Sequence, residues 1–236
     1  MNVSVFVPKQ LVRWWSAVAS CASRDDSRVV LTGVLVRVGA QSHPILGDFT
    51  GVSFTATDSY RLLSVGIPAD IGTADGHGPS VVVEPGACHS VLIPAASVKV
   101  GVSDGLALEW DTADGGGDVL AVSAKGRALV VPIAAGAELF PNWVNLFPTD
   151  DSVGRLDPFA VNGAYLGAML SDMAKAGGPD SVARIISAVE GRKPVRVDCV
   201  GDGFAAAGIV MPVRVPGGGE VLGHLPTVKA VKAVGS

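Results

Sequence analysis

The stretch Phe54-Thr55-Ala56-Thr57-Asp58-Ser59-Tyr60-Arg61-Leu62-Leu63 decides most of what the sequence says about the fold. Its first half alternates apolar and polar residues and its last two residues resume an apolar run, which is typical of two strands meeting at a polar corner. Asp58 and Ser59 suit a turn because their side chains can hydrogen-bond the nearby backbone. Tyr60 and Arg61 are long and amphipathic, so they either line a binding surface or lie over apolar neighbours at the edge of a hairpin.

Length and composition indicate a packed globular protein. The chain has 236 residues, enough for one large or two small domains, with 48% hydrophobic and 17% charged residues. Thirty glycines and fifteen prolines against few aromatic residues predict many turns and therefore many strands. The net charge of −4 excludes a globally basic nucleic-acid binder but not a local basic stripe.

Cysteine usage and the N-terminus predict a cytoplasmic protein. Cys21, Cys88 and Cys199 are widely spaced and include no CxxC pair, as expected of free thiols in a reducing compartment. The N-terminal residues lack the charged start and apolar core of a signal peptide. Apolar runs stay well short of the roughly 20 residues that span a bilayer.

The N-terminal region predicts a strand over Val3–Val7 followed by a helix over Lys9–Ser23. At 100° per residue, one helix face is apolar and the other is polar and carries positive charges, among them Arg13. The polar face is either an ordinary solvated surface or a surface for an anionic partner.

The rest of the chain is dominated by strand patterns, with a second amphipathic helix after Asn162, which we expect to cap it, and before the breaker at residues 177–179. A weak helix is expected after Pro94. The expected strands cover residues 29–38, 51–56, 61–67, 80–84, 90–93, 106–110, 119–122, 128–133, 182–189, 195–200 and 204–215, with Phe159 and Val161 in a further strand before the second helix.

Catalytic chemistry is not indicated, so we expect no enzyme activity, no metal and no cofactor. The four histidines, His43, His77, His89 and His224, lack metal-ligand spacing. Cys88 and His89 are adjacent and would point apart in a strand, which is unsuitable for a nucleophile and its base. The glycines at residues 115–117 are not followed by the Lys-Ser/Thr pair of a phosphate loop.

Four segments, taken in order, resemble the bacterial DNA polymerase III β sliding clamp family. Ala56–Leu62 resembles its "ATD-x-[HYR]-R-L" signature, and Leu31-Thr32-Gly33-Val34-Leu35 resembles the strand before that signature. Phe140–Pro148 resembles the "FPxYxxLxP" segment that closes the middle domain, and Ile209–Val215 resembles the C-terminal "MPMR-L" strand. The matched segments extend over most of the chain.

The resemblance implies an α+β DNA-clamp fold of repeated half-modules, each a strand, a helix and further strands, with antiparallel sheets outside and helices on the inner face. Residues 1–148 resemble the middle domain, with half-modules at about 1–67 and 80–148. Residues 149–215 resemble the last half of the C-terminal domain, and residues 216–236 form a Gly-rich linker and tail. Family rings contain twelve half-modules, whereas three are counted here, so we expect a short, phage-encoded member of the family.

In this family, polymerases and other partners insert a short hydrophobic peptide into a groove between the middle and C-terminal domains. Apolar groove residues would receive a Leu or Phe anchor, and polar ones would hold the peptide backbone. The residues that match the groove are Leu31, Thr57, Ser59, Tyr60, Arg61, Leu62, Pro148, Asn162, Tyr165, Ile209, Met211, Pro212, Val213 and Arg214.

Two functions remain open at this point. The first is a homo-oligomeric sliding clamp, a polymerase processivity factor that encircles duplex DNA without reading its sequence. Its DNA-facing charges would be Lys9, Arg13, Arg24 and Lys175. The second is a protein-interaction module or decoy that keeps the peptide groove but encircles no DNA. The basic face of the first helix favours the first function, and the missing half-module favours the second.

Overall fold

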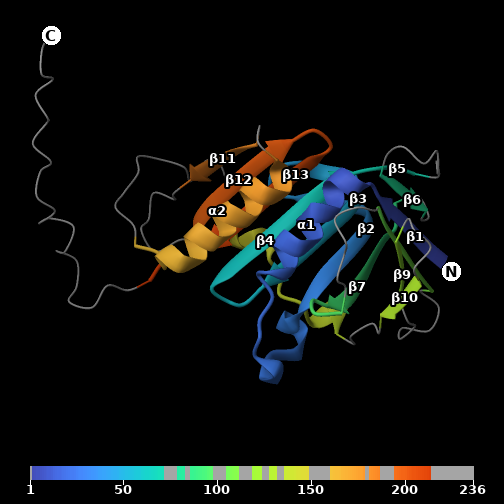
Figure 1. The fold of residues 1–236 in the computed structure, drawn as a ribbon, viewed down its shortest axis with the longest axis horizontal. Helices are drawn as coiled ribbons and strands as arrows, with labels where there is room; N and C mark the ends of the chain where they lie inside the picture. The colour runs from blue at the N-terminus through green and yellow to red at the C-terminus, as the bar shows by residue number, and fades with distance from the viewer. Residues whose placement is uncertain are drawn as a thin grey trace, which may run out of the picture.

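In the residues that it describes, the computed structural model has two sheets and two α-helices (Figure 1). It describes residues 2–71, 79–82, 86–97, 105–111, 119–123, 128–131, 136–148, 160–178, 181–186 and 194–213. In that part of the chain the strands are antiparallel apart from one short parallel pair. The α+β class and the strand-rich character expected from the sequence are confirmed.

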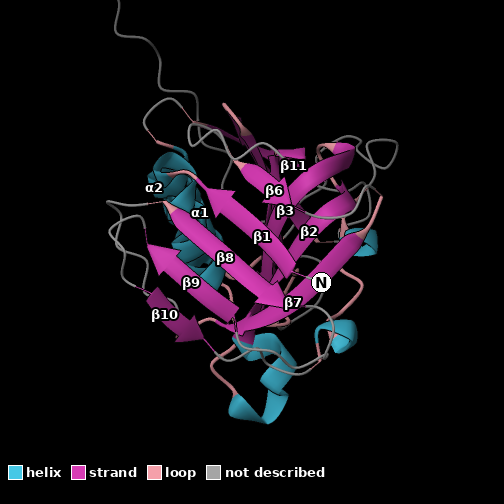
Figure 2. Cartoon of the chain, turned by 90° about the vertical axis from the view of Figure 1, so that its right-hand side faces the viewer, coloured by secondary structure: helices cyan, strands magenta, loops and turns pink. Residues whose placement is uncertain are grey.

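A six-stranded sheet has the strand order β10-β9-β8-β1-β6-β5. Figure 2 shows β10, β9, β8, β1 and β6 side by side. The N-terminal strand lies inside this sheet, because β1 pairs along its whole length with β8 and along its other edge with β6. The strands are β1 (Asn2–Val7), β5 (Asp70–Ile71), β6 (Ser80–Val82), β8 (Leu106–Asp111), β9 (Val119–Ser123) and β10 (Ala128–Val131).

A seven-stranded sheet has the order β11-β12-β13-β4-β3-β2-β7. The N-terminal and C-terminal strands of this sheet meet where β13 pairs antiparallel with β4, from Ala205 opposite Gly66 to Val210 opposite Arg61. The C-terminal strands therefore continue the sheet of the N-terminal ones. The strands are β2 (Gly33–His43), β3 (Gly47–Thr57), β4 (Arg61–Pro68), β7 (Cys88–Pro94), β11 (Val182–Ile186), β12 (Val195–Gly201) and β13 (Phe204–Val210).

Helices α1 (Lys9–Ala19) and α2 (Gly163–Gly177) lie side by side on one face of the seven-stranded sheet (Figure 1). Trp14 and Trp15 of α1 are fully buried, against Phe204 and Phe54 respectively. Met173 of α2 is buried in the same continuous core, which also takes in side chains from both sheets. Burial of these apolar faces is the main force that holds the helices to the sheet.

A second, smaller core covers the opposite face of the seven-stranded sheet. The closing segment, Phe140–Pro148, contains the short 3₁₀ helix η3 (Val144–Leu146) and follows the 3₁₀ helix η2 (Ala137–Leu139). Its large side chains pack on Leu35, Leu62, Leu92 and Ile209 of the sheet. The members contributed by the segment are Phe140, Trp143 and Phe147. The sheet is thus buried on both faces where β4 meets β13.

Several predicted element boundaries are wrong. The strand expected from Val29 begins only at Gly33, because residues 26–32 form the 3₁₀ helix η1 (Asp26–Thr32), whose start is capped by Asp25 accepting from the Ser27 amide. Leu31 therefore lies in η1 and not in a strand. Helix α1 ends at Ala19 and not at Ser23, and β13 ends at Val210 and not at Val215.

Other predicted elements fall partly outside the described residues. Val161 makes an isolated bridge with Pro212 but no longer strand, and Phe159 is not described. Ala95–Ser97 form a turn, and the rest of the weak helix expected after Pro94 is not described. Among the helices that are described, none is long and apolar enough to cross a membrane.

Candidate partner-binding site

The loop between β3 and β4 is held by its own side chains. The Asp58 Oδ1 accepts from the amides of Tyr60 and Arg61 at 3.0 and 2.9 Å, which closes the turn. Thr57 Oγ1 accepts from the Ser59 amide at 3.1 Å and donates to the Arg61 carbonyl at 2.8 Å. Ser59 has a positive φ of 78°, a strained conformation that these bonds offset. The loop is therefore a fixed element that presents the side chains of Tyr60 and Arg61.

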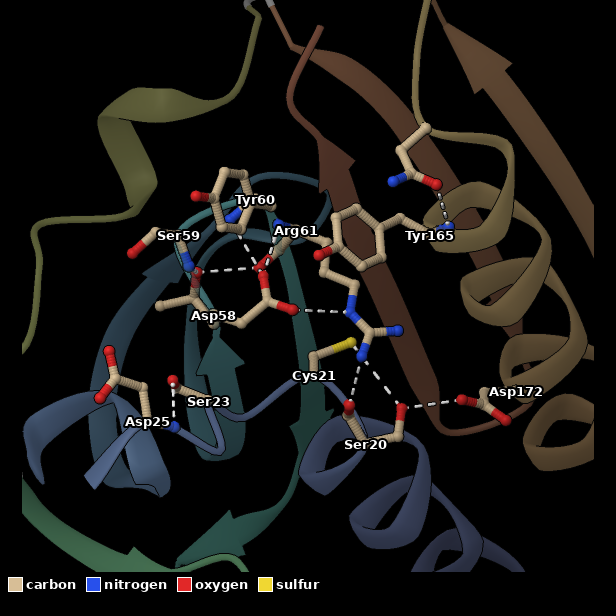
Figure 3. A network of polar contacts seen from close by, with 12 residues as sticks. Ser20, Cys21, Ser23, Asp25, Asp58, Ser59, Tyr60, Arg61, Tyr165 and Asp172 are labelled. Carbon is tan, nitrogen blue, oxygen red and sulfur yellow. Dashed lines mark hydrogen bonds and ion pairs between the residues drawn. The ribbon is translucent and has the colours of Figure 1, made fainter. Parts of the chain in front are cut away.

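The Arg61 guanidinium points inward and joins three elements (Figure 3). Its Nε donates to Asp58 Oδ2 at 3.1 Å, and its Nη2 donates to the carbonyl of Ser20, just past α1, at 2.7 Å. Its Cζ lies 5.3 Å from the centre of the Tyr165 ring, at the start of α2, in a cation–π contact. Arg61 thus fixes the β3–β4 loop against the ends of both helices.

A second contact joins the two helices beside Arg61. Ser20 Oγ donates to Asp172 Oδ2 of α2 at 2.7 Å.

The neighbouring Cys21 thiol is buried, and burial raises its pKa to about 11 against the lowering effect of Arg61. Cys21 therefore stays protonated at neutral pH and is unsuited to act as a nucleophile.

The chain after β13 lies between the loop and the start of α2. The Met211 amide donates to the Tyr60 carbonyl at 2.8 Å, and the Val213 amide donates to the Ala160 carbonyl at 2.9 Å. Tyr60 stacks on Tyr165 with ring centres 6.0 Å apart. Main-chain bonds and ring stacking therefore bring residues from sequence positions 60, 165 and 211–213 to one place.

Large apolar groups remain exposed there. Tyr60 is 58% exposed, Met211 37% and Val213 45%. Leu62 and Ile209 lie two residues away on β4 and β13, are paired with each other and are only 2% exposed. The three exposed apolar side chains, which we call the Tyr60–Met211–Val213 surface, are therefore carried by chain segments that main-chain hydrogen bonds hold together.

The structure brings most of the predicted groove residues to this region but gives them different environments. Ser59, Tyr60, Asn162, Met211 and Val213 are exposed. Half-buried positions are occupied by Leu31, Arg61, Tyr165 and Pro212, and buried ones by Thr57, Leu62, Pro148 and Ile209. Arg214 lies outside the described residues.

Two of the polar side chains that were expected to bind a partner, Arg61 and Asn162, form hydrogen bonds within the chain itself. The Arg61 guanidinium makes the three contacts described above, and Asn162 Oδ1 caps α2 by accepting from the amides of Ala164 and Tyr165 at 2.9 and 3.4 Å. Capping by Asn162 confirms the expected start of this helix. The Asn162 amide nitrogen and the tyrosine hydroxyls are the polar groups of this surface that suit peptide recognition best.

The four residues expected to face DNA are all exposed. Lys9 and Arg13 lie on α1, Arg24 follows α1, and Lys175 lies on α2. Arg13 and Lys175 border one cleft between the helices, together with Asp172. The Lys175 ammonium lies 3.9 Å from an Asp172 carboxylate oxygen, so the local positive charge of α2 is partly neutralised.

Sequence reasoning missed a second hollow on the opposite face of the sheet. Its floor is formed by Leu35, Phe140 and Trp143, and Arg37 and Asn142 are among the polar side chains around it. The aromatic residues of the closing segment are the signal that could have indicated it. No cluster of metal-ligating side chains is found in the described part of the chain.

Comparison with known proteins finds matches among solved structures but no match to a family model or to a curated protein sequence. No family model and no curated protein matches the chain. The DNA polymerase III β chain of Streptococcus pneumoniae matches with a TM-score of 0.56 at 16% identity over 89% of this chain and 64% of that one. The Helicobacter pylori β clamp in complex with carprofen matches with a TM-score of 0.61 at 12% identity over 90% of this chain and 67% of that one.

A third match has nearly full coverage of both proteins. The PCNA of A. fulgidus, solved with the C-terminal region of FEN-1 bound, matches with a TM-score of 0.52 at 11% identity over 90% of this chain and 99% of that one. The chain spans about 64% of the length of the streptococcal clamp. At these identities the comparisons establish the fold, and they confirm the clamp fold that the four sequence segments predicted.

Proposed function

We propose that this chain is a sliding-clamp-type protein that binds short hydrophobic peptides of replication proteins at the Tyr60–Met211–Val213 surface. The observation that carries the proposal is that three exposed apolar side chains lie on chain segments that main-chain hydrogen bonds hold together. A preorganised surface loses little entropy when a peptide docks on it. The protein would act by binding and not by catalysis, in the cytoplasm, without a cofactor.

The surface suits a peptide with a leucine or phenylalanine anchor. Met211 is flexible and polarisable, and Tyr60 offers a flat ring whose position is set by stacking on Tyr165. Leu62 and Ile209, two residues from Tyr60 and Met211, are buried against Phe140, Trp143 and Phe147 and so fix the strands that carry the surface. The solved PCNA complex with the FEN-1 C-terminal region supports this proposal by analogy, since that protein shares the fold.

The peptide proposal is tested with a fluorescent, polymerase-type clamp-binding peptide titrated with the full chain. Met211→Ala and Tyr165→Ala should each weaken binding by about tenfold or more, because each removes a large apolar contact or its support. Val200→Ala is the matched control, since Val200 is also exposed (57%) but lies on β12. Lack of binding by the wild-type chain, or equal losses in the control, would contradict the proposal.

We further propose that the clamp encloses duplex DNA as a homo-oligomer. Exposed Lys9 and Arg13 on the helix face support it, because phosphate contacts need positive charge and no base readout. The test is retention on a closed circular DNA followed by release when the DNA is cut. Loss of the protein only on linearisation is expected of a ring, and equal retention on both forms contradicts it.

One observation favours the alternative of a peptide-binding module that encircles no DNA. On α2, Lys175 is paired with Asp172 and the helix has no other basic residue, so its surface offers little attraction for phosphates. Peptide binding without topological retention on circular DNA would identify this second function.

A further inference from the structure

A cleft lies between helices α1 and α2, and the side chains at its rim carry charge. Each helix contributes three of the side chains around this cleft of about 290 Å³: Arg13, Ser16 and Ala17 from α1, and Asp172, Lys175 and Ala176 from α2. Ala17 and Ala176 are buried and small, which leaves room between the helices. Arg13 and Lys175 are exposed, so the cleft opens to solvent between two cationic side chains.

The two cations of the cleft lie in different electrostatic surroundings. Asp172 is the one carboxylate on either helix, and the Lys175 ammonium lies 3.9 Å from its Oδ1. Among the described residues Arg13 has no ion-pair partner, and its own helix contains no acidic residue. The positive charge of Arg13 is therefore free to attract an anion, whereas that of Lys175 is shared with a carboxylate.

Asp172 is held more firmly than the lysine beside it. Its Oδ2 accepts from Ser20 Oγ, at the end of α1, at 2.7 Å (Figure 3). The Asp172 side chain is 25% exposed, and that of Lys175 is 75% exposed. A hydrogen-bonded, half-buried carboxylate stays in place, whereas the long lysine side chain can leave it for another anion. The cleft therefore contains a fixed negative charge with a movable positive charge next to it.

We propose that the cleft receives a phosphate of duplex DNA and that Asp172 keeps this contact weak. Asp172 does so in two ways, by holding the ammonium of Lys175 and by repelling the phosphate itself. Arg13 then makes the stronger phosphate contact, and Ser16 offers a neutral hydroxyl donor beside it.

This inference rests on the enclosure of DNA proposed above and deepens it, because it assigns unequal roles to the charged residues of the helix face. A weak phosphate contact suits a protein that stays on DNA because it encloses the duplex, since tight phosphate binding would slow its movement along the duplex.

The test is titration of a fluorescent DNA duplex with the full chain, followed by fluorescence anisotropy at several salt concentrations. Asp172→Asn should tighten binding by about threefold or more at low salt, because Lys175 is then free and the repulsion is removed. It should also steepen the fall of log affinity with log salt concentration, by up to about 0.9 for one added phosphate contact. Asparagine keeps an oxygen that accepts from Ser20 Oγ, so the contact between the helices is preserved.

Glu138→Gln is the matched control, since it removes the same charge from an exposed residue of η2, on the other face of the sheet. It should change the affinity by less than about twofold. Lys175→Gln alone should cost less affinity than Arg13→Gln, whereas in the Asp172→Asn background it should remove the gain. A purely structural role of Asp172 predicts no such dependence on Lys175.

Wild-type binding that Asp172→Asn leaves unchanged or weakens would overturn this inference and leave the proposed enclosure of DNA standing. Equal losses in Arg13→Gln and Lys175→Gln would overturn the inference in the same way. If the wild-type chain and Asp172→Asn both fail to bind duplex DNA at low salt, the proposed enclosure of DNA is overturned together with this inference.

Discussion

Two arginines on opposite faces of the seven-stranded sheet join C-terminal elements, strand β12 and helix α2, to the rest of the chain, and they lie in contrasting environments. Arg196 of β12 is 4% exposed and bonds Asp198 at 2.7 Å, the Pro148 carbonyl at 3.1 Å and the Pro44 carbonyl at 3.2 Å. Arg61 of β4 has a side chain 15% exposed and bonds Asp58 and the Ser20 carbonyl on the helix side.

The two arginines contribute to different properties, one to the stability of the fold and the other to the geometry of the site. Arg196 links β12, the β2–β3 turn and the end of the closing segment, all inside the protein, so its loss leaves buried polar groups without partners. Arg61 borders the exposed surface and orients Tyr165 and the β3–β4 loop. We therefore expect Arg196 to determine how stable the fold is and Arg61 to determine how the peptide surface is shaped.

Removing the buried guanidinium should have the largest effect. Arg196→Met should lower the free energy of unfolding by about 3–5 kcal/mol, because Asp198 stays buried with only part of its pairing. Urea unfolding measures it. Arg184→Met is the matched control: it contacts the same Asp198 from a side chain 66% exposed, and should cost less than about 1 kcal/mol. Equal losses in the two variants would refute the contrast.

His43 should make the face that holds Arg196 sensitive to acid. Burial lowers the pKa of His43 to about 4, from 6.5 in the unfolded chain. Since the unfolded chain binds the proton more tightly, the stabilising contribution is complete above pH 6.5 and is lost as the pH falls toward 4, by at most about 3 kcal/mol.

The measurement is urea unfolding between pH 7 and pH 4 for wild type and His43→Asn. Asparagine keeps an acceptor for the Ile45 amide, which now donates to His43 Nδ1 at 3.3 Å, but it does not titrate. The variant should be less stable at pH 7 and should lose less stability on acidification. Parallel curves for the two proteins would exclude His43 as the source.

Arg61→Gln should cost less, about 1–2 kcal/mol, because the site is partly open to water and only the Ser20 carbonyl and Asp58 lose a charged partner. Arg28→Gln serves as its control, since Arg28 is 56% exposed and contacts Ser59 of the same loop at 3.0 Å. Its cost should stay within about 0.5 kcal/mol. Chemical unfolding of both variants measures the two costs. A larger loss of unfolding free energy in Arg28→Gln than in Arg61→Gln would contradict the role of Arg61 in holding the loop against the helices.

The fold could be predicted from the sequence where pattern and turn chemistry agree. Alternation before Asp58 and the apolar run after Arg61 predicted the hairpin, and Asn162 predicted the start of α2. The 3₁₀ helix at residues 26–32 could not be predicted from hydrophobicity, since Val29, Val30 and Leu31 look like a strand and the capping by Asp25 decides otherwise. Local side-chain bonding overrode strand propensity there.

The sequence predicted that residues from distant segments lie together, but it did not predict how their side chains are oriented. The resemblance assembled residues from three distant segments, and the main-chain bond from Met211 to Tyr60 brings two of them together. The Arg61 side chain points inward because the Ser20 carbonyl at the end of α1 accepts its hydrogen bond. Arg196 lies in an ordinary strand pattern, which does not indicate its bond to Asp198. Such roles depend on long-range neighbours that no local pattern contains. The domain boundaries and the groove assignment stay predictions.

The most direct test of the central claim is a hydrogen-exchange footprint of a polymerase-type clamp-binding peptide on the full chain. We expect peptide-dependent protection in residues 58–62, 162–166 and 209–213, where the Tyr60–Met211–Val213 surface lies, and none in residues 137–147 around the second hollow. Protection confined to residues 137–147, or absent at saturating peptide, would contradict the claim that this surface is the partner site.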